Sequence, residues 1–270
     1  MGKLAGKVTI VTGGAGGIGS GTCRLLAREG AAVVVADVPQ AKPSTLAEEL
    51  VRTGHRAIGV EVDISDEAQV EGMLRATLDT FGRLDGLHAN AAATYLVARD
   101  RLLTDLARTD LEEAFQVNVV GTWLCCKHAI PAMIETGGGS IVATSSAAAT
   151  HADTSKTAYG ITKAGVAQLM RTVATQFGKK GIRANTILPG LIIHDGVTSM
   201  DENFKKIIRA NTLTPEFGNP ESIGSLVAYL FSDEARYLQG QEINVDGGLF
   251  VHSVQYAWQQ EEFSGTRVQP

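Results

Sequence analysis

The chain has 270 residues, 44% of them hydrophobic and 20% charged, with a formal net charge of −5. This composition is typical of a globular α/β protein and does not indicate intrinsic disorder. The negative charge and the lack of a Lys/Arg cluster argue against nucleic-acid and membrane-surface binding, so we expect a small-molecule partner, no nucleic acid and no membrane.

Short runs rich in β-branched residues alternate with longer segments of helical periodicity. Strands are expected at residues 8–12, 32–37, 57–63, 86–90, 140–145, 182–188 and 241–246. Helices are expected at residues 17–29, 44–53, 66–81, 110–135, 157–179 and 219–232. This alternation predicts an α/β fold with one parallel sheet of about seven strands flanked by helices. No linker interrupts it, which indicates a single domain over residues 1–249.

Residues 191–213 depart from this rhythm, because a long stretch of mixed character follows the sixth strand. Long loops in α/β proteins often close over a binding site, so we expect a lid here. The tail, residues 250–270, carries aromatic side chains among polar ones. It packs either on a neighbouring subunit or on its own domain, and the sequence leaves both possibilities open.

The three cysteines, Cys23, Cys125 and Cys126, are odd in number and show no CxxC spacing. Buried, inert thiols are therefore expected, with no disulfide framework, no metal cluster and a reducing compartment. The first residues lack the apolar core and cleavage site of a secretory signal, and no segment reads as a membrane span. A cytoplasmic protein is the expectation.

A glycine-rich turn follows the first strand, in the run TGGAGGIG at residues 12–19. It fits GxGxxG through Gly14, Gly16 and Gly19, and TGxxxGxG through Gly13, Gly17 and Gly19. Glycine lets the backbone approach a pyrophosphate, and the amides of the following helix favour negative charge. The strand, turn and helix together predict a Rossmann-type, doubly wound dinucleotide-binding fold.

Asp37 closes the second predicted strand, 18 residues after Gly19. A carboxylate at this place accepts hydrogen bonds from the adenosine ribose and repels a 2′-phosphate. No Lys or Arg lies within residues 8–23 to offset that repulsion, so NAD is favoured over NADP. Asp63, at the end of the third strand, either accepts from the adenine amino group or caps the helix that starts near Asp66.

Tyr159 and Lys163 are four residues apart in a predicted helix, so their side chains share one face. A tyrosine ordinarily ionises near pH ~10, and a neighbouring ammonium favours the phenolate. This pair predicts a proton-transfer group that works closer to neutrality.

The order and spacing of the glycine loop, Asp37, Asn90, Asn118, a serine and the Tyr/Lys pair resemble the short-chain dehydrogenase/reductase family. The resemblance covers residues 5 to about 249. In that family the serine lies thirteen residues before the tyrosine, which selects Ser146 over Ser145.

The resemblance implies four catalytic residues. Tyr159 is the acid/base for the substrate oxygen, and Ser146 holds that oxygen. Lys163 binds the nicotinamide ribose and lowers the pKa of Tyr159, and Asn118 supports a water relay. Without the family, Ser146 is a turn residue at a strand end and Asn118 a polar helix residue.

The resemblance also implies the cofactor contacts. HANAAA aligns Asn90 with the second asparagine of the family's Asn-Asn-Ala-Gly strand end, while Ala89 and Ala92 replace the first asparagine and the glycine. The expected cofactor-binding residues are Gly13, Gly17, Ile18, Gly19, Asp37, Asp63, Ile64, Asn90, Ala91, Tyr159, Lys163, Pro189, Gly190 and Ile192. His194 stands where a threonine is frequent, and it faces the carboxamide, the substrate or solvent.

These observations predict an oxidoreductase that moves a hydride between NAD(H) and a secondary alcohol or ketone with a hydrophobic or cyclic body. The expected lining of the substrate pocket is Thr94, Tyr95, Leu96, Ala147 to His151, Leu191, Ile193, Val197, Met200, Phe204 and Ile208, unless these residues fill the core. The alternatives are a cis-dihydrodiol dehydrogenase of aromatic breakdown and a non-catalytic dinucleotide-binding regulator. The family further implies a homo-oligomer, a tetramer or a dimer.

Overall fold

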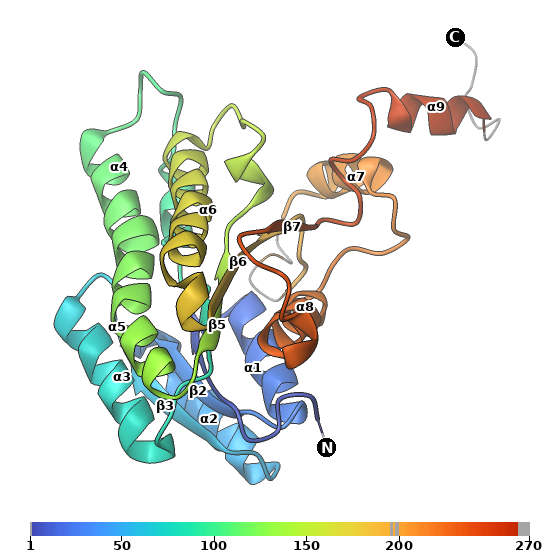
Figure 1. Ribbon diagram of the computed structural model, residues 1–270. Coiled ribbons are helices and arrows are strands. Elements are labelled where there is room, and N and C mark those ends of the chain that lie inside the picture. The colour runs from blue at the N-terminus through green and yellow to red at the C-terminus, as the bar shows by residue number, and fades with distance from the viewer. Residues whose placement is uncertain (1, 195–196, 198–199, 264–270) are drawn as a thin grey trace.

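A computed structural model describes residues 2–194, 197 and 200–263, and within them seven strands form one parallel sheet (Figure 1). The strands are β1 (Val8–Thr12), β2 (Ala32–Asp37), β3 (Ala57–Glu61), β4 (Gly86–Ala89), β5 (Gly139–Thr144), β6 (Ile182–Pro189) and β7 (Glu242–Val245). Their order across the sheet is β3-β2-β1-β4-β5-β6-β7. The fold is the Rossmann-type arrangement that the sequence predicts.

Helices cover both faces of the sheet. They are α1 (Gly17–Arg28), α2 (Pro43–Arg52), α3 (Glu67–Phe81), α4 (Arg108–Phe115), α5 (Thr122–Glu135), α6 (Thr157–Phe177), α7 (Glu202–Asn211), α8 (Pro220–Phe231) and α9 (Tyr256–Phe263). Short 3₁₀ turns occur at Pro39–Ala41 (η1), Thr94–Ala98 (η2), Ala147–Ala149 (η4), Gly178–Lys180 (η5) and Asp233–Ala235 (η7).

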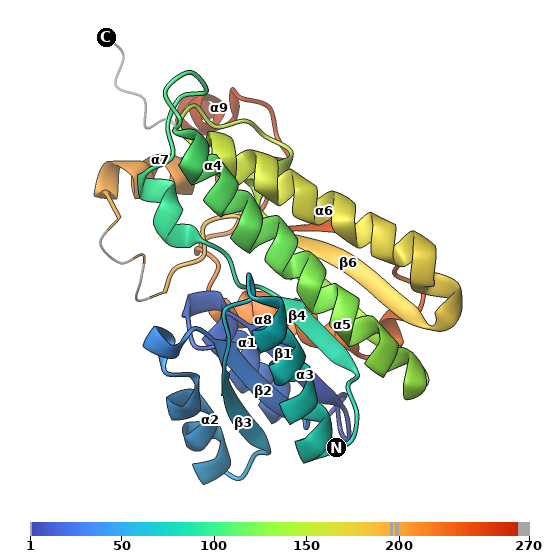
Figure 2. The same cartoon turned by 90° about the vertical axis from the view of Figure 1, so that its left-hand side faces the viewer.

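The strands are apolar on both sides because each face packs on helices. In β2, Val33 and Val35 pack in the core shared with α1, α2 and α8. Val34 and Ala36 alternate with them and join the core formed with α3, α5 and α6. Figure 2 looks onto this second face. Two separate apolar cores thus hold the sheet in place.

The strand order reverses direction between β1 and β4, since the chain first builds outward to β3 and then returns to the other side of β1. At such a switch point the loops that follow the strands diverge and leave a crevice at the carboxyl edge. The residues that end β1, β2, β4, β5 and β6 all lie on this edge, which positions the candidate site.

The helix predicted over residues 110–135 is present as one helical stretch, Arg108–Glu135, but the prediction misses a π-helical segment in its middle. The structure has α4, then a π-helical segment, Gln116–Gly121, and then α5 with Pro131 inside it. π-helical segments are rare and occur mostly as single turns inside α-helices, so helical periodicity alone does not predict one here. The other predicted strands and helices agree with the structure within two residues at each end.

The segment after β6 and the tail lie together beyond the sheet (Figure 1). The predicted lid contains α7, which Asp201 caps by accepting from the Asn203 and Phe204 amides. The tail packs on its own domain: the His252 Nε2 lies 2.6 Å from the Asn211 carbonyl oxygen, and the Phe250 ring stacks on His151 at 4.3 Å. These contacts involve the described part of the tail within one chain, so its packing on a neighbouring subunit stays a prediction.

One helical stretch among the described residues, Arg108–Glu135, has the length and apolar composition of a membrane span. Of the most apolar 18-residue part of this stretch, 56% is buried inside the protein, because α5 packs against the sheet. That burial is what a core helix shows. Cys23, Cys125 and Cys126 are unpaired and buried, as expected.

Candidate active site

A cleft of about 480 Å³ opens at the carboxyl edge of the sheet. It is lined by most of the residues expected at the site, namely Gly13, Gly17, Ile18, Gly19, Asp37, Asn90, Ala91, Ser146, Tyr159, Lys163, Pro189, Gly190 and Ile192. Asn118, Asp63 and Ile64 are not part of its lining. Residues spread over the chain from Gly13 to Ile192 therefore meet in one place.

The glycine loop leaves room for a bulky group beside the backbone. Gly13 has a φ of +63°, a conformation that L side chains rarely adopt. A side chain at Gly19 would collide with the carbonyl of Gly13. Gly13, Gly17 and Gly19 line the cleft, as does Gly16, whereas Gly14 packs against β1 and β2. The cradle and the unpaired first-turn amides of α1 fit a dinucleotide pyrophosphate.

Asp37 ends β2 and lines the same cleft. One carboxylate oxygen accepts from the Ala15 amide at 3.0 Å and the other from the Val38 amide at 2.8 Å. Among the described residues that line the cleft, the only lysine or arginine is Lys163. Apart from it, no lysine or arginine in the described lining of the cleft accompanies Asp37 to receive a 2′-phosphate, and this lining fits NAD.

Asn90 fastens the glycine loop to β4. Its amide Nδ2 donates to the Thr12 carbonyl at 3.1 Å and to the Gly13 carbonyl at 3.3 Å. The Thr12 hydroxyl in turn accepts from the main-chain amides of Asn90 and Ala91. These contacts fix the loop before any ligand arrives.

Tyr159 and Lys163 project from the first turns of α6 toward the end of β5. The Lys163 Nζ donates to the Thr144 carbonyl at 2.8 Å and lies 5.7 Å from the Tyr159 ring centre. Ser146 hydrogen-bonds to the Tyr159 side chain, whereas the Ser145 hydroxyl donates to the Lys163 carbonyl at 2.8 Å and is buried. The geometry thus favours Ser146 over Ser145 as the partner of the tyrosine.

Burial has the largest influence on the pKa values of Tyr159 and Lys163. It raises the pKa of Tyr159, and the Ser146 hydrogen bond and the Lys156 charge offset this rise only in part. Burial lowers the pKa of Lys163 to about 8. In the structure of the chain alone, burial thus keeps the pKa of Tyr159 above its ordinary value. The lowering by Lys163 that the resemblance implies stays a prediction.

Asn118 lies in the π-helical segment and is buried. Its Oδ1 accepts from the Ala93 amide at 2.8 Å, and its Nδ2 donates to the Thr162 hydroxyl at 3.0 Å. The side chain thus ties the loop after β4 to α6, next to the catalytic pair.

Asp63 and Ile64 lie beside the cleft region without lining it. The Asp63 Oδ1 accepts from both the amide and the hydroxyl of Ser65. Asp66, not Asp63, caps α3, since it accepts from the Ala68 and Gln69 amides. The cap interpretation of Asp63 is therefore wrong. Ile64 is buried in the core formed with α3 and α5.

His194 lines the cofactor cleft, and its ring lies against Gly17 so closely that a side chain at Gly17 would overlap it. It is absent from the lining of the neighbouring substrate cavity. Of the three environments considered for His194, the structure thus favours the cofactor side.

A second cavity of about 620 Å³ adjoins the cleft and shares Ser146 and Tyr159 with it. Its apolar lining includes Val97, Ala147, Ala148, Leu191, Val197, Met200, Phe204, Ile208, Leu249 and Phe250. Two expected lining residues are elsewhere. Tyr95 is 59% exposed with its hydroxyl on Glu113, and Leu96 is buried in a small core with Ala158.

Ile193, Ala149 and Thr150 are likewise missing from this lining, while several unexpected residues belong to it. Asp153 and Lys156, an ion pair at 2.6 Å, form a charged part of the wall. Leu249 and Phe250 come from the tail, about a hundred residues after Ser146. No local pattern in the sequence signals these long-range contributions.

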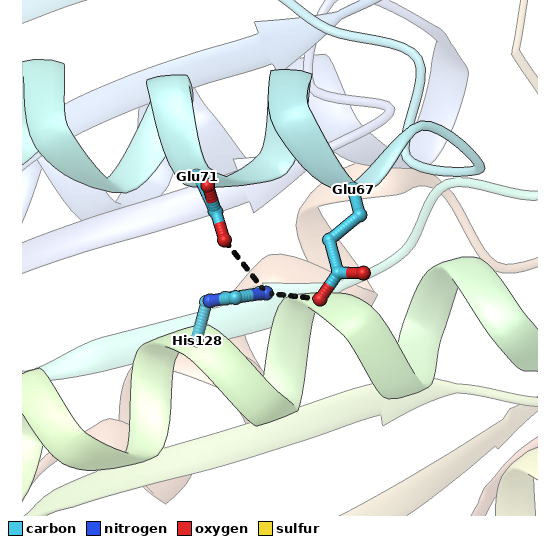
Figure 3. Close-up of side chains that lie close together, drawn as sticks. All are labelled: Glu67, Glu71 and His128. Carbon is cyan, nitrogen blue, oxygen red and sulfur yellow. Dashed lines mark hydrogen bonds and ion pairs between the residues drawn. The ribbon is translucent and has the colours of Figure 1, made fainter.

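A separate polar cluster joins α3 to α5, away from the cleft. Figure 3 shows the His128 ring between Glu67 and Glu71, with its Nε2 2.9 Å from a Glu67 oxygen and 3.8 Å from a Glu71 oxygen. The Lys127 ammonium contacts the same oxygen of Glu67. Lys127 and His128 lower the pKa of Glu67. The described contacts make this cluster an ion-paired link between two helices.

Comparison with known proteins agrees with this geometry. Residues 13–250 match the family described as enoyl-(acyl carrier protein) reductase. The chain is 37% identical to a probable short-chain type dehydrogenase/reductase of Bradyrhizobium diazoefficiens, with 95% of this chain and 92% of the relative covered. It is 36% identical to the 7alpha-hydroxysteroid dehydrogenase of Bacteroides fragilis, with 94% and 98% covered.

A solved structure of a 7alpha-hydroxysteroid dehydrogenase, complexed with NADH and 7-oxo glycochenodeoxycholic acid, superimposes with a TM-score of 0.85. The sequence identity is 29%, and 91% of this chain and 94% of that chain are covered. The chain belongs to the short-chain dehydrogenase/reductase family. It is an oxidoreductase, as the sequence predicts.

Proposed function

We propose that this protein transfers a hydride between NAD(H) and a secondary alcohol or ketone with a hydrophobic or cyclic body. One observation carries the proposal: Ser146 and Tyr159 lie at the junction of the dinucleotide-sized cleft and the apolar cavity. A substrate oxygen bound at these hydroxyls has its carbon next to the cofactor side of the site. Proximity of this kind removes much of the entropic barrier to reaction.

The residues that hold NAD follow from the cleft. Gly13, Gly17 and Gly19 with the first amides of α1 hold the pyrophosphate, and Asp37 accepts from the adenosine ribose. Further contacts come from Ile18, Asp63, Ile64, Asn90, Ala91, Lys163, Pro189, Gly190 and Ile192. NAD supplies the hydride acceptor, and the solved structure of a relative with NADH supports this choice.

In the oxidative direction, the phenolate form of Tyr159 would accept the proton of the substrate hydroxyl while Ser146 holds the oxygen, and the hydride of the carbinol carbon would pass to NAD. In reduction, Tyr159 returns that proton to the carbonyl oxygen. In this direction the protonated phenol is the proton donor. Lys163 binds the nicotinamide ribose and lowers the pKa of Tyr159 when the cofactor is bound, and Asn118, held by Ala93 and Thr162, supports a water relay to solvent.

The substrate class follows from the cavity wall. Leu191, Met200, Phe204, Ile208 and Phe250 offer an apolar surface for a ring system. A hydroxysteroid dehydrogenase among the relatives fits a body of this kind. The proposed lid over this cavity is the segment 191–213 with α7, of which residues 195–196 and 198–199 lie outside the described residues, and the proposed single domain spans residues 1–249.

The test is reduced-nicotinamide formation by the purified protein with NAD or NADP and a panel of hydroxysteroids, monocyclic secondary alcohols and a cis-dihydrodiol. Turnover of a hydroxysteroid or cyclic alcohol with NAD is the expected result. Turnover of the dihydrodiol alone would assign the protein to aromatic breakdown. Tight NADH binding without turnover of any member would contradict the proposal.

The proposal includes assembly as a homotetramer or dimer in the cytoplasm. Phe115, Trp123 and Ile161, on α4, α5 and α6, are large apolar side chains that are 36–46% exposed, which suits contact with a second chain. The unpaired thiols suit a reducing compartment. Sedimentation equilibrium should give a mass of two or four chains, and a monomer would contradict the assembly.

A further inference from the structure

Tyr159 lies in the first turn of α6, where main-chain amides have no partner within the helix. Lys156, the residue that precedes the helix, provides no side-chain cap. The partner comes from far along the chain instead. Asp100 accepts from the Ala158 amide at 3.1 Å through one oxygen and from the Tyr159 amide at 2.9 Å through the other.

Asp100 is built into the protein interior, with only 5% of its surface exposed. Among the described residues no lysine or arginine forms an ion pair with its carboxylate, whose remaining hydrogen bond comes from the Arg101 amide at 3.0 Å. The Arg101 guanidinium donates to the Asp100 main-chain carbonyl at 2.8 Å. A buried carboxylate is costly unless hydrogen bonds and positive charge compensate it. Here the amino end of α6 supplies both.

The same residue anchors a wall of the substrate cavity. Its amide donates to the Leu96 carbonyl at 3.0 Å, which fastens it to the turn Thr94–Ala98. Thr94 and Val97 of this turn line the cavity with Tyr159. A second link runs alongside, because the Thr157 hydroxyl donates to the Arg101 carbonyl at 2.8 Å.

We propose that Asp100 is a positioning residue, which holds the first turn of α6 and the Thr94–Ala98 turn in one fixed relation and thereby sets Tyr159 against the substrate wall. Its catalytic consequence rests on the proposed function. Without the carboxylate, two main-chain amides lose their acceptor and the turn that carries the phenol is free to shift. Misplacement by about 1 Å costs on the order of 10²-fold in rate.

The chain offers a matched control. Asp66 caps α3 in the same way, accepting from two first-turn amides at 2.9 and 3.3 Å, and neither it nor α3 lines the cleft or the cavity. Asp66→Ala and Asp100→Ala both remove a capping carboxylate. Each should lower Tm by about 2–4 °C.

The variants differ in catalysis. For Asp100→Ala we expect kcat to fall about 10- to 100-fold while the KM for NAD and the Kd for NADH stay within about twofold, since the cofactor cradle is elsewhere. Asp100→Asn keeps one acceptor oxygen and should lie between the alanine variant and wild type. Asp66→Ala should keep the wild-type kcat. Equal kcat losses for Asp100→Ala and Asp66→Ala, or a rise in the NADH Kd that matches the fall in kcat, would overturn the proposal.

Two further measurements keep the test decisive. If Asp100→Ala does not fold, a folded Asp100→Asn with the wild-type kcat overturns the proposal, and a several-fold lower kcat supports it. Hydrogen exchange of residues 157–160 needs no substrate, so it separates failure of this inference from failure of the proposed function. Exchange there should accelerate about tenfold or more in Asp100→Ala and not in Asp66→Ala, and unchanged exchange would refute the role of Asp100.

Discussion

The two halves of the site are held in different ways. On the cofactor side, Asp37 and Asn90 bind main-chain groups of the glycine loop, and the Thr12 hydroxyl accepts from the Asn90 amide, so the loop is fixed by short contacts at the ends of buried strands. On the substrate side, α7 has no buried residue, and it meets the tail through contacts such as that of His252 with Asn211. The cofactor side thus lies on a rigid edge, the ends of the buried strands, whereas substrate choice depends on an outer layer, α7 and the tail, that is loosely packed.

The largest expected effect tests whether catalysis separates from cofactor binding. Tyr159→Phe removes the proton-transfer group and should lower kcat by about 10²- to 10⁴-fold, measured by initial rates. The Kd for NADH, measured by fluorescence, should stay within about twofold. Tyr95→Phe is the control, because its hydroxyl binds Glu113 at the surface, and it should keep normal rates. Near-normal turnover by Tyr159→Phe would refute the assignment.

The next largest effect concerns the cofactor side. Asp37→Asn removes the charge that repels a 2′-phosphate but keeps an acceptor for the loop amides. The preference for NAD over NADP, as the ratio of kcat/KM values, should fall by about 10- to 100-fold, the range for hydrogen bonds to charged groups. Glu61→Gln, on the neighbouring strand and outside the cleft, should leave the ratio unchanged. An unaltered ratio in Asp37→Asn would mean that another group selects the cofactor.

Replacement of Lys163 tests how much the burial of a charged group in the active site lowers the free energy of unfolding. Its ordinary pKa of 10.5 falls to about 8 in the fold, so between these values the unfolded chain binds more protons than the folded protein. Stability from this group therefore rises with pH across that window and is lowest below pH 8. Lys163→Met should raise the unfolding free energy at pH 7 on the order of 2 kcal/mol while abolishing turnover.

Urea unfolding at several pH values measures this effect. The gain of Lys163→Met over wild type should shrink as pH rises from 8 toward 10. Lys179→Met, at an exposed position, should show no such dependence. A destabilised Lys163→Met at pH 7 would show that the hydrogen bond to Thr144 outweighs the burial of the charge.

The smallest expected effect probes the outer layer. Phe250→Ala removes the ring that stacks on His151 and lines the cavity, and aromatic pairs contribute about 0.5–1.5 kcal/mol. The kcat/KM for a ring-containing alcohol should fall up to about tenfold, without change in NADH affinity. Val251→Ala, on the exposed neighbour, should have no effect. A loss of NADH binding in Phe250→Ala would contradict the separation of the two halves.

The sequence predicts the strands, the glycine loop and the Tyr159/Lys163 pair well, because each is marked by residues close together in the chain. β-branched runs mark the strands, glycine spacing marks the loop, and Tyr159 and Lys163 are four residues apart on one helix. It does not reveal the Asp100 cap on α6 or the Phe250 contact with His151, which join segments far apart in the chain. The π turn at Asn118 is also hidden, since its side-chain bonds to Ala93 and Thr162 exist only in the fold.

The most direct test of the central claim is isotope transfer. A cyclic secondary alcohol that the protein oxidises is deuterated at its carbinol carbon and incubated with NAD in ordinary water, and the reduced cofactor is analysed by mass spectrometry and NMR. Direct hydride transfer beside Tyr159 predicts one deuterium in the nicotinamide ring of every reduced cofactor. Reduced cofactor without deuterium would contradict it.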